Sequence, residues 1–275
     1  MITRMSTVGT AGKTLRRSGS TIHYWLTGPE DGRLVTFTPG ASMDHRMFDE
    51  QVSVVASAGY RVLTWDVRGH GLSKPIGEDF SLPAVVEDLL ALMDLSGREQ
   101  AVFVGQSFGG YVAQEALFRH PERVEALALI GCTNITVLPS KLEYWALKLS
   151  PIMFGLWPWG NLRKQIAKNT ALKPEVRSYA FEATGMLSKE EFVTVWKAVA
   201  DVLHEEPGYR IERPLLLTHG EHDRTGNVAK GAPEWAEREP DCRYEVIPQA
   251  SHNANQDNPA FFNRLLLSFL EQSAR

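Results

Sequence analysis

The sequence predicts an α/β protein with an eight-stranded, mostly parallel sheet, helices on both faces and a helical insertion. Short runs rich in β-forming residues alternate with helical patterns along most of the chain. Several of these runs are apolar enough to be covered on both faces, which is typical of strands in a parallel sheet. Repeated strand-helix-strand order of this kind indicates a parallel sheet between two layers of helices.

Eight segments are expected to form the strands. They are KTLRR (13–17), TIHYWLTG (21–28), RLVTFTPG (33–40), YRVLTWDVRG (60–69), QAVFVGQS (100–107), VEALALIG (124–131), RPLLLTHG (213–220) and CRYEVIPQ (242–249). The first two alternate in polarity and lie close together, so we expect them to form an antiparallel hairpin at one edge. Between the others, apolar residues recur at helical spacings of three and four, as at Val86, Leu89, Leu90 and Met93.

The residues between 133 and 212 interrupt this alternation. No convincing strand pattern is found there, whereas several helical patterns are separated by prolines. We therefore expect a helical insertion over 133–212. The sheet domain is then formed by two parts of the chain, 1–132 and 213–275.

Length and composition indicate an ordinary globular protein. The 275 residues can bury one large core, and 43% of them are hydrophobic. A net charge of -4 does not indicate binding to nucleic acid or to an anionic membrane, although net charge says nothing about a local patch of basic residues. No apolar run approaches the roughly 20 residues of a membrane span. Only Cys132 and Cys242 are present, which argues against a disulfide framework and favours a reducing cytoplasm. The expected oligomeric state is a monomer or a homodimer.

The segment GQSFGG, which begins at Gly105, stands where a strand pattern gives way to a helical one. A dinucleotide fingerprint requires glycine in the place of Ser107 and an acid at the end of the next strand, and both are missing. A P-loop requires a lysine after the glycines, which is missing too. The remaining interpretation is the G-x-S-x-G turn, which exposes a serine nucleophile on a strained connection between strand and helix.

A serine hydroxyl is a poor nucleophile unless a base takes its proton, so this interpretation requires an acid and then a histidine downstream. The strand at 213–220 is followed by Glu221-His222-Asp223, and the last strand by Ser251-His252. Because the carboxyl ends of the strands converge on one crevice, His252 is the expected base. His219 and His222 with Asp223 could instead suggest a metal site. No helical spacing aligns the two imidazoles, however, so we expect no metal.

Four segments in this order resemble the α/β-hydrolase superfamily, in its esterase, lactonase and haloperoxidase-like branch. They are WDVRGHGLS, VGQSFGGYVAQEALFRHPERV, LLLTHGEHD and PQASHNANQDNP. The resemblance implies that Ser107 is the nucleophile, Asp223 the acid and His252 the base, and that the insertion is a helical cap. It also assigns Asp66 and Arg68 to a structural turn, where we expect a buried ion pair that shapes the loop.

One position departs from the family pattern, because Pro39-Gly40 stands where His-Gly is usual. The oxyanion hole is built from backbone N–H groups, which the resemblance assigns to Ala41 and Phe108. Both donors can therefore persist without the histidine, whose loss affects the support of the loop. Ser42 is expected either to add a hydroxyl near the site or to cap the helix that begins around Asp44.

The expected function is a serine hydrolase without cofactor or metal that cleaves a small-molecule ester or lactone through an acyl-enzyme. A perhydrolase or haloperoxidase, or a C–C bond hydrolase, would use the same residues. A ligand-binding protein that keeps a slow triad would share them as well. Epoxide hydrolases and haloalkane dehalogenases of this fold use aspartate at the turn, so Ser107 argues against both.

The insertion contains the segment YWALKLSPIMFGLWPWG, which has more large apolar residues than one amphipathic stripe requires. Most of these are expected to pack the cap onto the sheet domain. Some are expected to line an apolar substrate pocket, and the candidates are Trp145, Trp157 and Trp159.

Overall fold

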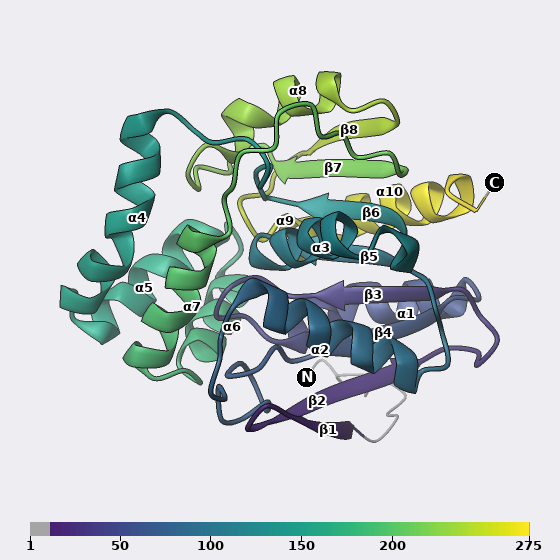
Figure 1. Cartoon of the computed structure of the whole chain (residues 1–275), viewed down its shortest axis with the longest axis horizontal. Coiled ribbons are helices and arrows are strands. Elements are labelled where there is room, and N and C mark those ends of the chain that lie inside the picture. The colour runs from purple at the N-terminus through teal and green to yellow at the C-terminus, as the bar shows by residue number, and fades with distance from the viewer. Residues whose placement is uncertain (1–11, 275) are drawn as a thin grey trace.

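The computed structural model describes residues 12–274, and a single eight-stranded sheet runs through its centre (Figure 1). The strands are β1 (Lys13–Arg17), β2 (Ser20–Thr27), β3 (Leu34–Thr38), β4 (Arg61–Trp65), β5 (Ala101–Gln106), β6 (Val124–Ile130), β7 (Leu215–Gly220) and β8 (Cys242–Ile247). Their order across the sheet is β1-β2-β4-β3-β5-β6-β7-β8. β2 pairs antiparallel with β1 and β4, and the other neighbours are parallel. The predicted strands and the edge hairpin are confirmed.

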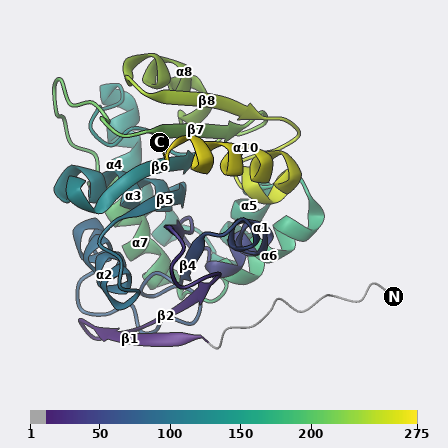
Figure 2. The ribbon, with the colours of Figure 1, turned by 90° about the vertical axis from the view of Figure 1, so that its right-hand side faces the viewer.

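Helices cover both faces of the sheet, as Figure 2 shows from the side. On one face lie α2 (Leu82–Leu95), α3 (Phe108–Arg119) and α8 (Val228–Arg238), and on the other α1 (Asp49–Ser57) and α10 (Pro259–Gln272). Strand side chains alternate between the two layers, so Phe103 belongs to the first core while Val102 and Val104 belong to the second. This double burial explains why the central strands are apolar at almost every position.

Capping side chains fix where several of these helices begin. The first N–H groups of a helix have no acceptor within it, so a side-chain oxygen at the preceding residue stabilises the start. The hydroxyl of Ser81 accepts from the N–H of Ala84 at the start of α2, and the amide oxygen of Asn258 accepts from the N–H of Phe261 at the start of α10. A proline stands in the first turn of each, where its missing N–H costs nothing.

Four helices lie between β6 and β7, beyond the ends toward which the parallel strands point (Figure 1). We call them the cap helices: α4 (Lys141–Leu156), α5 (Trp159–Thr170), α6 (Pro174–Thr184) and α7 (Lys189–Asp201). All four fall within the expected insertion over 133–212. The expected sheet domain starts at residue 1, but residues 1–11 lie outside the described part of the chain. Between 12 and 274 we find no helix whose length and apolar character would let it cross a bilayer.

Candidate active site

Ser107 lies in the turn between β5 and α3, with φ of 51° and ψ of -111°. A positive φ is uncommon for residues other than glycine, so the surrounding packing must hold this strained turn. The neighbouring glycines allow it: a Cβ atom on Gly105 would lie 2.2 Å from the carbonyl oxygen of Gly109, and one on Gly109 would lie 2.0 Å from that of Thr38. Larger residues would force the strand and helix apart. Ser107 lines a cavity at the carboxyl ends of the strands.

His252 and Asp223 form a buried pair at the edge of the same cavity. Asp223 follows β7 and His252 follows β8, and the histidine Nδ1 lies 2.9 Å from Oδ2 of the aspartate. The other carboxylate oxygen accepts from the N–H of Thr225 at 2.8 Å. The pair packs against Gly131, where a Cβ atom would come within 3.1 Å of the imidazole. Backbone and glycine therefore fix the position of both side chains.

The charge of Asp223 determines which nitrogen of His252 carries the proton. Burial alone would raise the pKa of Asp223, but the charge and hydrogen bond of His252, with the N–H of Thr225, outweigh it and hold the pKa below its usual value. An ionised carboxylate only accepts hydrogen bonds, so Nδ1 of His252 is the donor. In the neutral ring Nε2 is then the acceptor, which is the state that a general base requires.

The two expected oxyanion donors, Ala41 and Phe108, are both close to Ser107 in the fold, because Phe108 follows it in the chain and Ala41 lines the same cavity. Phe108 is the first residue of α3, and Ala41 lies in the loop between β3 and η1 (His45–Phe48). Among the described residues, neither backbone N–H donates to another protein group. Both are therefore free to bind a developing negative charge.

Cap contacts support the loop that carries Ala41, where the usual histidine is replaced by Pro39. Ser42 is buried with φ of 63°, and its hydroxyl lies 3.0 Å from that of Thr184 at the end of α6. The N–H of Asp44 donates to the hydroxyl of Tyr179, also on α6, at 3.1 Å. Of the two expected roles of Ser42, capping is excluded, because Asp44 caps the short helix η1 (His45–Phe48). Neither cap residue stands out in the sequence.

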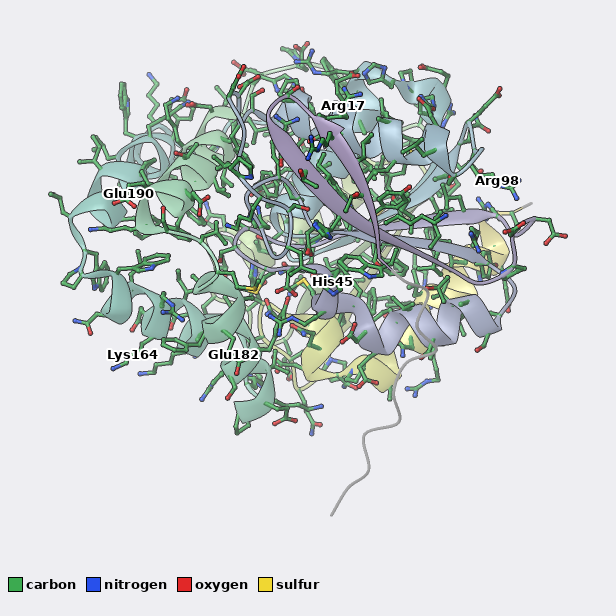
Figure 3. All side chains as sticks on the ribbon, turned by 90° about the horizontal axis from the view of Figure 1, so that it is seen from below. Arg17, His45, Arg98, Lys164, Glu182 and Glu190 are labelled. Atoms are coloured by element: carbon green, nitrogen blue, oxygen red, sulfur yellow. The ribbon has the colours of Figure 1, made fainter. Side chains whose placement is uncertain are left out.

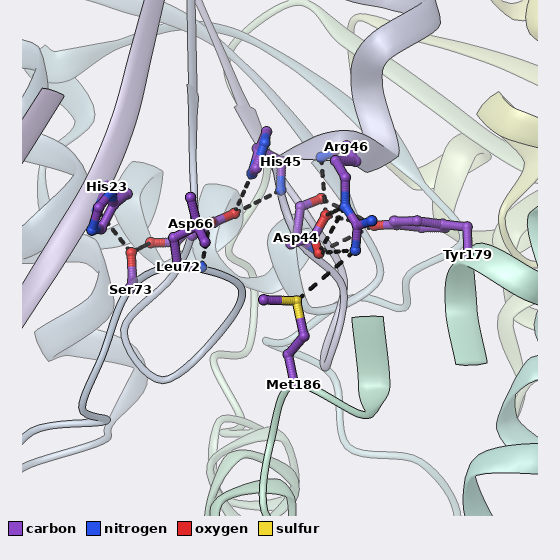
Figure 4. A network of polar contacts seen from close by, with 9 residues as sticks. All are labelled: His23, Asp44, His45, Arg46, Asp66, Leu72, Ser73, Tyr179 and Met186. Carbon is purple, nitrogen blue, oxygen red and sulfur yellow. Dashed lines mark hydrogen bonds and ion pairs between the residues drawn. The ribbon is translucent and has the colours of Figure 1, made fainter. Parts of the chain in front are cut away.

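A polar network centred on Asp66 extends this support (Figure 4). One oxygen of Asp66 accepts from the N–H of His45 and lies 2.8 Å from its Nδ1, and the other accepts from the N–H of Leu72. Burial lowers the pKa of His45, but the hydrogen bond and charge of Asp66 outweigh it and raise the pKa overall. Asp44, His45 and Asp66 are close enough to share a metal ion. Their polar atoms already bind protein groups, including the Arg46 guanidinium at 2.8 Å from Asp44, so we assign the cluster a structural role.

The expected ion pair between Asp66 and Arg68 is not formed. Arg68 pairs instead with Asp88 of α2, at 2.7 Å and fully buried. Asp66 accepts from backbone and histidine groups. Both residues do shape the loop after β4, Arg68 through Asp88 and Asp66 through His45 and the N–H of Leu72 within the loop.

The cavity holds about 950 Å³ between the sheet domain and the cap. Ser107, His252, Ala41 and Ser42 line its floor, and aromatic residues from the cap line its roof. Those aromatic residues are Phe154, Trp157, Phe192 and Trp196. Phe192 and Trp196 could have been found in the sequence as an aromatic pair four residues apart, a spacing that places both on one face of α7.

Of the three tryptophans expected at the pocket, only Trp157 lines it. Trp145 is 62% exposed on the outer side of α4. Nine residues separate it from Phe154, which is half a turn beyond two full turns and puts the two side chains on opposite faces. Trp159 packs on Phe192, with ring centroids 5.3 Å apart, outside the lining of the cavity.

The lining of this cavity contains cations but no carboxylate. Lys168 on α5 and Arg224, next to Asp223, are its lysine and arginine, and neither forms an ion pair within residues 12–274. His222 also lies at the mouth and is exposed. The cavity therefore favours neutral or anionic molecules over cationic ones.

The alternative metal site at His219, His222 and Asp223 receives no support from the geometry. Nε2 of His219 lies 2.7 Å from the hydroxyl of Tyr244, and its Nδ1 lies 2.8 Å from the carbonyl oxygen of Gly220. Both ring nitrogens of His219 are therefore occupied by protein groups.

Comparison with known proteins agrees with this architecture. Residues 33–259 match the family model described as alpha/beta hydrolase fold, so the chain belongs to the α/β-hydrolase family. The AB hydrolase superfamily protein YfhM of Bacillus subtilis is 29% identical, over 92% of this chain and 96% of that protein. 3-Oxoadipate enol-lactonase 1 of Acinetobacter baylyi is 25% identical, over 93% and 95%. The crystal structure of a hydrolase from Pseudomonas aeruginosa PA01 has a TM-score of 0.82 and 25% identity, over 96% and 99%.

Proposed function

We propose that this α/β-hydrolase family member is a serine hydrolase that cleaves a carboxylic ester or lactone through an acyl-enzyme. The observation that carries the proposal is the strained turn of Ser107 in the same cavity as the His252–Asp223 pair. A hydroxyl, an imidazole and a buried carboxylate in this order meet the requirements of nucleophilic acyl transfer. The lactone part of the proposal is supported by the sequence similarity to 3-oxoadipate enol-lactonase 1.

In the proposed acylation step, Oγ of Ser107 attacks the carbonyl carbon while Nε2 of His252 takes its proton. The carbonyl oxygen becomes an oxyanion, which the N–H groups of Ala41 and Phe108 bind. The tetrahedral intermediate collapses when the bond to the leaving oxygen breaks, and His252 returns the proton to that oxygen. Asp223 stabilises the imidazolium throughout and keeps its protonated Nδ1 in place.

Deacylation repeats the same steps with water as the nucleophile. Water attacks the acyl carbon, His252 takes its proton, and the bond to Ser107 breaks as the serine oxygen regains a proton from the imidazole. The product is a carboxylic acid, and for a lactone it is the corresponding hydroxy acid. No group is oxidised or reduced, so these steps require no cofactor.

We further propose that residues 133–212 act as a cap over the substrate and that the acyl part lies under its aromatic roof. Trp157, Phe192 and Trp196 supply apolar surface there, and each sheltered methylene would contribute about 0.8 kcal/mol. The absence of carboxylates from the lining argues for neutral or anionic substrates. A small to medium, largely apolar ester or lactone fits both features.

A substrate panel run beside Ser107→Ala tests the proposal. We expect the wild type to hydrolyse p-nitrophenyl esters or lactones, and the folded variant to lose at least about 1,000-fold in kcat. Near-wild-type hydrolysis by the variant would refute the assignment of Ser107. Circular dichroism and thermal unfolding serve to verify that the variant is folded.

Adding a peroxide-dependent bromination assay and a β-diketone to this panel separates the alternatives that use these residues. Bromination that depends on peroxide and exceeds ester hydrolysis would indicate a perhydrolase. Turnover confined to a β-diketone would indicate a C–C bond hydrolase. A burst of product without further turnover would indicate a binding protein with a slow triad.

A further inference from the structure

Helix α4 turns a stripe of large apolar side chains toward solvent. Successive helical residues are rotated by about 100°, so six positions spaced by three, four, three, one and three residues fall within an arc of about 100°. Their exposed fractions range from 52% to 82%. We call these six residues the outer stripe: Leu142, Trp145, Leu149, Ile152, Met153 and Leu156.

The opposite face of α4 is firmly packed, so the orientation of the outer stripe is fixed. Phe154 meets Trp196 of α7 edge to face at 5.1 Å, and the indole N–H of Trp196 donates to the hydroxyl of Ser150 at 2.6 Å. Lys148 pairs with Asp201 at the end of α7 at 2.7 Å. In Figure 1, α4 is the outermost helix of the cap. Its outer face therefore has no partner among the described residues.

The concentration of apolar surface on this helix is unusual. Of 14 exposed large hydrophobic side chains among the described residues, seven lie between Leu142 and Trp157. Monomeric soluble proteins rarely expose a contiguous apolar patch larger than about 300 to 600 Å². The outer stripe places six large side chains, each more than half exposed, side by side on one helix face, so this face is suited to contact with an apolar phase.

The charge around the stripe selects the kind of surface. The four cap helices together carry eight lysines and arginines against six acidic residues, and the excess lies on α4 and α5, which have five against one; the whole chain has a net charge of -4. Lys141 is exposed at the start of α4, and Lys164 projects from the outer edge of the cap in Figure 3. Basic residues beside an apolar helix face are attracted to anionic lipid headgroups.

We propose that α4 docks on an anionic lipid surface, with the outer stripe inserted at the boundary between headgroups and acyl chains. Trp145 suits that boundary because an indole is apolar but has a polar N–H. A second copy of the chain fits less well, since a symmetric contact would bring the same basic helices together. Trp157 follows α4 directly and lines the cavity, so docking brings the cavity mouth near the surface. The proposal does not depend on hydrolysis.

Co-sedimentation of the full chain with vesicles tests this. We expect binding to vesicles of phosphatidylglycerol with phosphatidylcholine, and weaker binding to phosphatidylcholine alone. The double variant Leu142→Gln/Leu156→Gln should lower the affinity at least about tenfold, because both leucines are 82% exposed and would enter the lipid. Leu95→Gln is the matched control, since Leu95 is also exposed but lies on α2. Lys141→Glu/Lys164→Glu should abolish the preference for anionic vesicles.

Several results would overturn the proposal. One is a wild type that binds neither vesicle, and another is equal loss of binding in the control variant. A third is a stable dimer in sedimentation velocity that only Leu142→Gln/Leu156→Gln dissociates, which would assign the outer stripe to a second copy. Hydrolysis of a water-soluble ester should be unchanged in these variants, so failure of docking is distinguishable from failure of the proposed function.

Discussion

Replacing Asp223 by asparagine perturbs the proposed triad without changing its shape. Both carboxylate oxygens of Asp223 accept hydrogen bonds, one from the backbone N–H of Thr225 at 2.8 Å and one from Nδ1 of His252 at 2.9 Å. Asparagine has only one acceptor oxygen, so one of these donors must face its NH2 group. Because the backbone donor is fixed, the imidazole is the group that changes: its proton moves to Nε2, which can no longer take the proton of Ser107.

The wrong tautomer and the lost charge together should lower kcat for ester hydrolysis by about 10,000-fold, as the same change does in other serine triads. Glu221→Gln is the matched control, because Glu221 is half exposed and, within residues 12–274, contacts the N–H of Gln249 and the exposed imidazole of His222, at 3.7 Å, rather than His252. Its turnover should stay within about twofold of the wild type, as for surface changes in general. Steady-state kinetics on both folded variants decide the matter. If kcat falls by less than about tenfold in Asp223→Asn, or falls further in Glu221→Gln than in Asp223→Asn, the acid of the triad is a residue other than Asp223.

Three further outcomes are expected. Turnover should fall on acidification through pH ~5, because a histidine base can take the serine proton only while its imidazole is neutral, and the lowered pKa of Asp223 keeps that carboxylate ionised; a rate that is flat to pH ~5 would count against a histidine base. Trp157→Ala should flatten the rise of kcat/KM from acetate to octanoate esters, whereas Trp145→Ala should not. If kcat/KM depends on chain length in the same way in both variants, Trp157 does not contact the acyl chain. Thr184→Val should leave the Ser42 hydroxyl without its partner and lower kcat several-fold along with Tm; a lower Tm with unchanged kcat would make the contact purely structural.

The sheet could be predicted from local patterns because its strands are buried on both faces. Runs such as AVFV at 101–104 are apolar at every position, as expected for a strand of a parallel sheet between two helix layers, and the repeated strand-helix order around them favours this arrangement. The edge hairpin shows alternating polarity because one face of β2 is more exposed. The cap was predictable only as a helical region, since its helices carry few signals for how they pack.

The triad candidates could be predicted because each follows a strand and the chain order is fixed by the fold. Details that depend on distant partners could not. Arg68 pairs with Asp88 rather than Asp66, and no local spacing indicates that choice. The exposure of Trp145 could not be predicted either, because a stripe of apolar residues normally indicates a buried helix face. The apolar face of α4 that remains in solvent breaks that rule.

The central claim is that Ser107 is the nucleophile of an acyl-enzyme, and labelling with a fluorophosphonate tests it most directly. This reagent forms a stable adduct with a serine that a neighbouring base activates. Intact-mass analysis should show one adduct per chain, peptide mapping should locate it at Ser107, and Ser107→Ala should not be labelled. A protein that hydrolyses esters yet takes up the label at another residue, or none at all, would contradict the assignment of Ser107 as the nucleophile.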